Sequence, residues 1–215
     1  SLGKLDANIV AETARQIAKK MALIPYHGAT GSDTVVYDDS WLDLLKGASG
    51  IVSGSTTPTS GGTAGTDAQG VFNIVETLKN NFLGNIDTAP EVFMDNGIVV
   101  SMSPLHASYY FENYRKLFGT DTVVPVMEQL ANGRMTTWIH PGTRMRIVIQ
   151  NALGVTGEII ATRHKNPVLA FDLESDATRL KMWYDQTDDL IYWRLRVKMG
   201  TAWRALNADN VRYWG

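Results

Sequence analysis

Polar and apolar residues alternate without a break from Ile191 to Met199. One face of this stretch carries Trp193, Leu195, Val197 and Met199, and the other carries Tyr192, Arg194, Arg196 and Lys198. Alternation with period two is typical of a half-buried antiparallel strand. A shorter strand candidate, Leu180 to Tyr184, precedes it across an acidic turn at residues 185–189. We therefore predict a C-terminal sheet with a basic face and an apolar face, on which Trp193, Leu195 and Val197 point to the core.

Apolar residues recur at helical spacing in two earlier stretches. In residues 7–24 the stripe consists of Val10, Ala14, Ile17, Met21 and Ile24, and Pro25 is expected to stop the helix. In residues 69–83 the stripe consists of Phe72, Val75, Leu78 and Phe82, with Asp67 as the expected N-cap. Spacings of three and four residues place these side chains on one face, so each helix is predicted to bury that face.

The stretch Ile98 to Met102 is an apolar run between turn residues, which predicts a buried strand. Ser103 is the expected N-cap and Pro104 suits the first position of a helix over residues 105–118, which Gly119 ends. Further extended segments are predicted at residues 34–37, 123–127, 136–139 and 145–150, and a helical turn at residues 40–45.

Residues 46–70 are rich in Gly, Ser and Thr, which favours a loop between folded parts. We predict an α+β fold with a discontinuous peripheral domain, residues 1–55 plus 160–215, and an axial domain of residues 56–159 inserted into it. The first helix has an apolar stripe and the final strands have an apolar face, so both need a partner. The helix at residues 7–24 is therefore expected to lie along the C-terminal sheet.

The composition of the 215-residue chain excludes several classes of protein. At 44% hydrophobic residues the chain can bury a full core. A net charge of −2 argues against a dedicated nucleic-acid-binding domain. The absence of cysteine excludes disulfides, thiolate metal sites and cysteine nucleophiles. No apolar run approaches the ~20 residues that span a bilayer, so no membrane partner is expected.

Motifs that carry chemistry are missing from the sequence. The histidines His27, His106, His140 and His164 show no metalloenzyme spacing, and we expect surface or hydrogen-bonded roles for His106 and His164. The glycines of residues 61–70 are not followed by Gly-Lys-Ser/Thr, and GxSxG is absent. Asp38, Asp39 and Asp43, like Asp188 and Asp189, sit at predicted turns, where Asp is common for local hydrogen bonding. We therefore expect no catalytic residue, metal or cofactor.

Two groups of residues leave alternatives open. Arg194, Arg196 and Lys198 form a basic patch on one strand face, which is either a solvated face, a contact between subunits or a surface toward DNA phosphates. The alternative to a structural protein is an α+β enzyme or small-ligand-binding domain with a site built from scattered residues. Its candidate pocket residues are Tyr109, Tyr110, Arg115, His140 and Arg144.

The order of segments resembles that of a known family. ATRHKNPVLAFDLESD, a short strand, an acidic turn, WRLRVKMG and the closing NADNVRYW resemble the C-terminal part of tailed-phage major capsid proteins of the Hong Kong ninety-seven type. The matching positions are Thr162, Lys165, Asn166, Asp172, Asp176, Gly200 and residues 211–213. VFNIVETLKNNF, GIVVSMSP and LHASYYFENYRKLF resemble the axial domain of that family, and the first helix followed by WLDLLKGASGIV resembles its spine helix and the segment after it.

The resemblance implies a phage major-capsid-type fold, with the spine helix packed on an antiparallel sheet. It implies a phage or prophage shell protein rather than an enzyme, which self-assembles into pentamers and hexamers around packaged DNA in the bacterial cytoplasm and resides in the virion. A scaffolding protein and a maturation protease are the further partners it implies. An encapsulin-like bacterial shell protein shares the fold and stays an alternative. Because the family's arm and extended loop would precede the spine helix, we expect this chain alone not to form closed shells, although the full-length protein does.

Overall fold

The computed structural model describes residues 11–12, 14–16, 18–19, 22–26, 40–61, 68–119, 128–129, 136–154, 157–171, 181–185, 190–194 and 199–215. Its helices are α2 (Trp41–Gly47), α3 (Val71–Leu83) and α4 (Pro104–Phe118), with 3-10 helices η1 (Ala89–Phe93) and η2 (Asn151–Leu153). Its strands are β1 (Val52–Gly54), β2 (Ile98–Met102), β3 (Glu128–Gln129), β4 (Thr136–Ile139), β5 (Arg146–Ile149), β6 (Ile159–Arg163), β7 (Pro167–Phe171), β8 (Lys181–Asp185), β9 (Leu190–Arg194), β10 (Met199–Trp203) and β11 (Val211–Trp214). The α+β class is confirmed.

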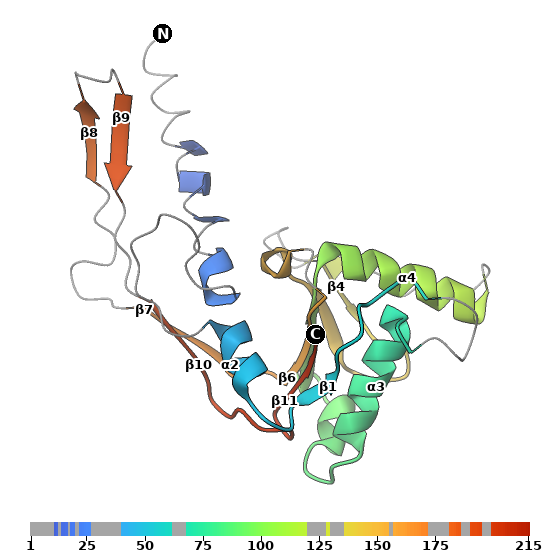
Figure 1. Cartoon of the computed structure of the whole chain (residues 1–215). Coiled ribbons are helices and arrows are strands. Elements are labelled where there is room, and N and C mark those ends of the chain that lie inside the picture. The colour runs from blue at the N-terminus through green and yellow to red at the C-terminus, as the bar shows by residue number, and fades with distance from the viewer. Residues whose placement is uncertain are drawn as a thin grey trace.

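A seven-stranded mixed sheet forms the centre, in the order β1-β11-β6-β2-β5-β4-β3. The pairs β1–β11 and β2–β5 are parallel, and the other neighbours are antiparallel. The remaining strands form two separate ladders, β7 with β10 and β8 with β9, which leave the sheet as a ribbon (Figure 1). We call the β7–β10 ladder the ribbon base and the β8–β9 ladder the ribbon hairpin.

Both faces of the central sheet are covered. On one face α3, η1 and α4 bury a large core that includes Phe82, Tyr110 and Trp138. On the other face α2 and η2 close a smaller core around Leu45 and Ile160 (Figure 1). Strand β6 shows the consequence, because its first four residues are all buried. A strand covered on both faces reads as a continuous apolar run instead of an alternating one.

The two main helices begin in different ways. The Ser103 hydroxyl accepts a hydrogen bond from the His106 N–H at 3.2 Å, so the predicted N-cap of α4 is confirmed. The prediction for α3 was wrong: the N-cap is Gly70, without a side-chain bond, and Asp67 lies outside the described residues. The amide oxygen of Asn113, on α4, instead accepts from the N–H of Phe72 at 3.0 Å. A tertiary contact thus replaces the local cap that sequence alone could suggest.

The C-terminal segments differ in part from the predicted sheet. The predicted strand at residues 191–199 corresponds to β9 and the start of β10, which pair with different partners. Strands β6 and β11 were assigned to the peripheral domain. In the central sheet β11 pairs with β1, which was also assigned to the peripheral domain, but β6 pairs with β2, which was assigned to the axial domain. The segment that leaves the sheet therefore runs from β7 to β10. The division at residues 55 and 160 stays a prediction.

The described residues between 11 and 26 are helical where the first helix was predicted. Pro25 does not stop this helix, because both Pro25 and Tyr26 are helical. Tertiary contacts hold this turn: the Tyr26 ring meets the Trp41 ring edge-on at 5.1 Å, and the Tyr26 hydroxyl accepts from the Gln150 amide at 3.0 Å. Of the predicted stripe, Ala14 is exposed and Ile24 partly buried. Packing of the whole helix on the C-terminal strands stays a prediction.

Two tryptophans attach the ribbon base to α2. The Trp41 indole N–H lies within hydrogen-bond distance of the carbonyl oxygens of Val168 and Ala202, at 3.2 and 3.1 Å. The Trp203 indole N–H donates to the Trp41 carbonyl at 3.3 Å, and the two rings lie 6.2 Å apart. Since Val168 pairs with Ala202, the Trp41 indole contacts both strands of the ladder at the same residue pair. The helix thereby fixes the position at which the ribbon leaves the body.

Candidate functional site

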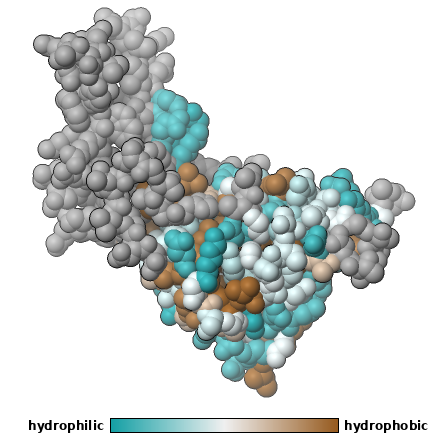
Figure 2. Space-filling view, viewed as in Figure 1, coloured by the Kyte–Doolittle hydropathy of each residue, from teal (hydrophilic) through white to brown (hydrophobic). Residues whose placement is uncertain are grey.

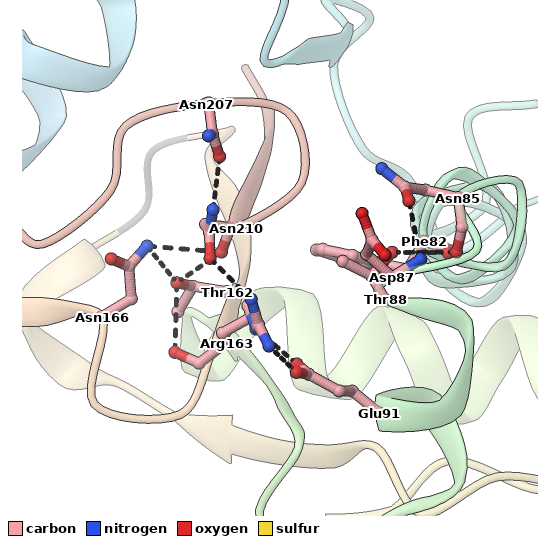
Figure 3. Close-up of polar contacts among 10 residues, drawn as sticks. All are labelled: Phe82, Asn85, Asp87, Thr88, Glu91, Thr162, Arg163, Asn166, Asn207 and Asn210. Carbon is pink, nitrogen blue, oxygen red and sulfur yellow. Dashed lines mark hydrogen bonds and ion pairs between the residues drawn. The ribbon is translucent and has the colours of Figure 1, made fainter.

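The turn between β6 and β7 is held by the buried side chain of Asn166. Its amide nitrogen donates to the Thr162 hydroxyl at 3.1 Å (Figure 3). The same nitrogen donates to the Ala205 carbonyl at 3.0 Å. Its amide oxygen accepts from the Ala205 N–H at 2.9 Å. Thr162 and Asn166 are two of the positions on which the resemblance rests. They fix the corner at which the chain passes from the central sheet into the ribbon.

An ion pair connects the end of β6 to η1. The Arg163 guanidinium donates to both carboxylate oxygens of Glu91, with Nε to Oε2 at 2.6 Å, and to the Asn210 side-chain oxygen at 3.1 Å (Figure 3). Such bidentate pairs fix geometry as well as charge. On the α3 side of η1, the Thr88 hydroxyl donates to the Phe82 carbonyl at 2.7 Å. The short helix is therefore anchored on both sides.

A groove of about 350 Å³ opens beside this corner, and we call it the corner groove. Gly97 forms part of its wall, where a Cβ would collide with the Glu91 carbonyl and where the Gly97 carbonyl accepts from the His164 N–H at 2.8 Å. The lining comes from three segments: Glu91, Met94, Asp95, Asn96 and Gly97; Arg163, His164, Lys165 and Asn166; and Arg204, Ala205 and Asn210. Four of these residues are basic and two are acidic.

A second polar cluster is buried between α3, α4 and the turn after β4. The Glu76 carboxylate accepts from His140 Nε2 at 2.6 Å, and His140 Nδ1 shares a hydrogen bond of 2.7 Å with the Tyr110 hydroxyl. Burial alone would raise the pKa of Glu76, but hydrogen bonds from His140 and Lys79 lower it to about 2. Burial also raises the pKa of Tyr110, so its hydroxyl keeps the proton.

This buried cluster has the order acid, histidine, hydroxyl, yet its hydroxyl cannot meet a ligand. Tyr110 and His140 are both fully buried. A groove of about 590 Å³ lies beside the cluster, and Glu76 is the member of the three that lines it. A carboxylate with a pKa of about 2 is a weak general base at neutral pH. The arrangement is suited to joining two helices to the sheet.

Of the five residues predicted for an enzyme pocket, the structure brings two into contact. Tyr110 and His140 are bonded, as described above. Arg144 is exposed and pairs with Asp95 at 3.4 Å. Tyr109 is half-buried and Arg115 is exposed on α4, and neither lines the groove next to Glu76. The five therefore do not converge on one cavity.

The predicted basic patch lies largely beyond what the structure describes. The backbone of Arg194 pairs with Lys181 in the ribbon hairpin, while its side chain and all of Arg196 and Lys198 lie outside the described residues. The side chains of Trp193, Leu195 and Val197 do so as well. The proposed core and solvent faces of that strand stay predictions.

The predicted histidine roles are corrected at one position. His106 was expected at the surface or hydrogen-bonded, but it is buried, and its Nδ1 has no hydrogen-bond partner within the described ranges. Burial lowers its pKa. His164 is exposed, as expected. Within the described ranges no three His, Asp or Glu side chains are placed to hold a metal ion, and no helix there has the length and apolar character to cross a membrane.

Sequence reasoning missed the corner groove. Arg163, His164 and Lys165 are consecutive in the sequence, and that basic run was a usable signal. Glu91 and Arg204 are far away in the chain, and only the pairing of β2 with β6 and of β7 with β10 brings them to the same corner. Comparison with known proteins adds nothing to this site, because neither a family model nor a curated protein matches the chain.

Proposed function

We propose that this chain is the folded body of a shell-forming subunit, a major capsid protein of a tailed phage or prophage that self-assembles into hexamers and pentamers around packaged DNA. In this proposal the first helix is the spine, the ribbon belongs to the peripheral domain, and α3, α4 and the strands between them form the axial domain. The order of segments along the chain supports the proposal, as does the resemblance at Thr162, Lys165 and Asn166. The role is structural and involves no catalysis.

The observation that carries the proposal is the open face of the ribbon base. By alternation, Val168, Ala170, Gly200 and Ala202 lie on one face of this ladder. Ala170, Gly200 and Ala202 are exposed, Val168 is half-buried, and none is charged. Solvated ribbons are normally protected against association by charged side chains. An uncharged, flat face of small residues fits a surface that another copy of the chain covers.

The body of the molecule is different, since the face of it seen in Figure 2 is mostly polar with small apolar patches. In a shell, each subunit makes several repeated contacts that are heterologous, which means that two different surface patches meet. A ribbon that projects beside a rigid body supplies two such different surfaces. In the proposal, the core of the body provides stability and the ribbon provides contacts between subunits.

Electron microscopy of the full-length protein tests this function. We expect closed particles of megadalton mass, or hexameric and pentameric rings where assembly factors are absent. A homogeneous monomer at all concentrations, together with a small molecule bound in the groove beside Glu76, would support the enzyme alternative instead. An encapsulin-like shell would be recognised by particles that enclose protein rather than DNA.

A further inference from the structure

Basic side chains line the corner groove, and most of them are unpaired within the part of the chain that the structure describes. Three exposed side chains on its wall have no carboxylate partner in the described part of the chain: His164, Lys165 and Arg204. The fourth basic residue, Arg163, is neutralised by Glu91. Asp95, the remaining carboxylate of the lining, is engaged with Arg144 at 3.4 Å. The groove therefore offers free donors while its own acceptors are occupied.

The backbone around these donors is held in an unusual conformation. Asn96 and Lys165, with φ of 58° and 64°, are the non-glycine residues with positive φ among those described, and both line the groove. For a lysine this conformation is costly and persists only where the surroundings enforce it. The Asn166 side chain and the bond from the His164 N–H to the Gly97 carbonyl enforce it here. Lys165 is thus presented at the groove by a rigid turn.

We propose that the corner groove is a binding site for the carboxylate side chains of an acidic protein segment. Arg and Lys donors arranged around a narrow cleft match carboxylate oxygens, and Arg204 can bind one with two parallel bonds. A nucleic-acid strand fits less well, because it needs basic side chains along many successive phosphates, whereas the groove offers three exposed basic side chains at one corner. The net charge of −2 also provides no extended basic surface for it.

The acidic segment we assign to the groove is the turn of the ribbon hairpin of a second copy. Asp185 and Leu190 form the last rung of that hairpin, and the residues joining them include Asp188 and Asp189. The hairpin lies at the far end of the ribbon from the central sheet (Figure 1). The corner groove of the same chain is therefore not the natural partner of this turn. The choice of a second copy rests on the proposed function, whereas the acidic ligand class rests on the groove.

Peptide binding to the 215-residue chain tests the assignment. The probe is a fluorescein-labelled peptide with the sequence of residues 183–191, followed by fluorescence anisotropy at low salt, where charge pairs are least screened. The matched peptide carries Asn in place of Asp185, Asp188 and Asp189. We expect the acidic peptide to bind about tenfold more tightly than the amide peptide. The double variant Lys165→Ala/Arg204→Ala should weaken acidic-peptide binding about tenfold, because both side chains are exposed donors of the groove.

The control variant is Arg115→Ala, which removes an exposed arginine of α4 far from the groove and should leave binding unchanged. Equal binding of the two peptides, or an equal loss with Arg115→Ala, would overturn the assignment. So would a DNA oligonucleotide that binds more tightly than the acidic peptide and depends on Lys165 and Arg204. If the peptide binds but the full-length protein never assembles, the shell proposal fails and the acidic-segment site stands. If shells form and the peptide does not bind, the site alone is refuted.

Discussion

The central sheet and the ribbon base are built from neighbouring stretches of the same chain, but they bury their side chains in opposite ways. Four of the five residues of β6 are buried, between a large core on one face and a smaller core on the other. Strand β7 begins four residues later, and none of the described side chains of β7 or β10 is buried. The difference shows which part of the molecule has its own core and which part, among the described side chains, does not.

A two-stranded ladder without a core is marginal in water. The ribbon base receives support from one side, through the indole groups of Trp41 and Trp203. Its other face, with Ala170 and Ala202, is open. We infer that the central sheet determines the stability of the chain and that the ribbon gains its full order only in contact with other copies. Each prediction below compares a change in one region with a matched change elsewhere.

The largest difference is expected between apolar residues of the two regions. Phe82 is fully buried at the end of α3, and Phe82→Ala should lower the free energy of unfolding by about 3–5 kcal/mol. Leu169 is half-buried on the ribbon base, so Leu169→Ala should lower the free energy of unfolding by about 1 kcal/mol or less. Urea titration of both variants measures this. Similar losses would mean that the ribbon belongs to the same cooperative core as the sheet.

The corner between the two regions should be the next most sensitive position. Asn166→Ala removes the amide that bonds Thr162 and Ala205, and it leaves the partly buried Ala205 N–H without its acceptor. We expect a loss of about 2–3 kcal/mol. The exposed Asn207, which bonds Asn210 nearby, serves as the control, and Asn207→Ala should cost about 0.5 kcal/mol. Thermal unfolding that ranks the two variants in the reverse order would contradict the role of Asn166.

The buried cluster in the body should show itself in the pH dependence of stability. The pKa of Glu76 is about 2 in the folded protein, below its ordinary 4.5, so its contribution is complete above about pH 5 and is lost as the pH falls toward 2. Since about a third of the Glu76 side chain is exposed (31%), we expect about 1–2 kcal/mol rather than the full linkage value. The wild-type chain should lose this amount between about pH 5 and pH 2, whereas Glu76→Gln should not. Parallel pH profiles would refute the assignment.

The smallest effect concerns the attachment of the ribbon. Trp41→Phe removes the indole N–H that contacts the carbonyls of Val168 and Ala202, at a cost of about 1 kcal/mol. Hydrogen exchange should then become faster in the amides of β7 and β10 and stay unchanged in β2 and β6. Tyr26→Phe, which removes the hydroxyl bonded to Gln150, is the matched control and should leave the ribbon amides unaffected.

The same comparison explains what the sequence could predict. Elements of the body with a local signature were placed well: the strand Ile98–Met102 agrees with the prediction residue for residue, and Ser103 caps α4. The cap of α3 was missed because its partner, Asn113, lies 41 residues away from Phe72. The corner groove was missed for a similar reason, since the ladders that unite Glu91, Arg163 and Arg204 connect distant strands. Periodicity reports the burial of a segment, but it does not report which distant segment provides the partner.

The most direct test of the account is a substitution on the open face of the ribbon base in the full-length protein. Ala202→Asp places a charge on an exposed position, so the free energy of unfolding of the isolated chain should change by no more than about 0.5 kcal/mol. Electron microscopy and light scattering should show closed particles for the wild-type protein and none for the variant. Particles of the same size and yield with Ala202→Asp would contradict the claim that this face is the contact between subunits.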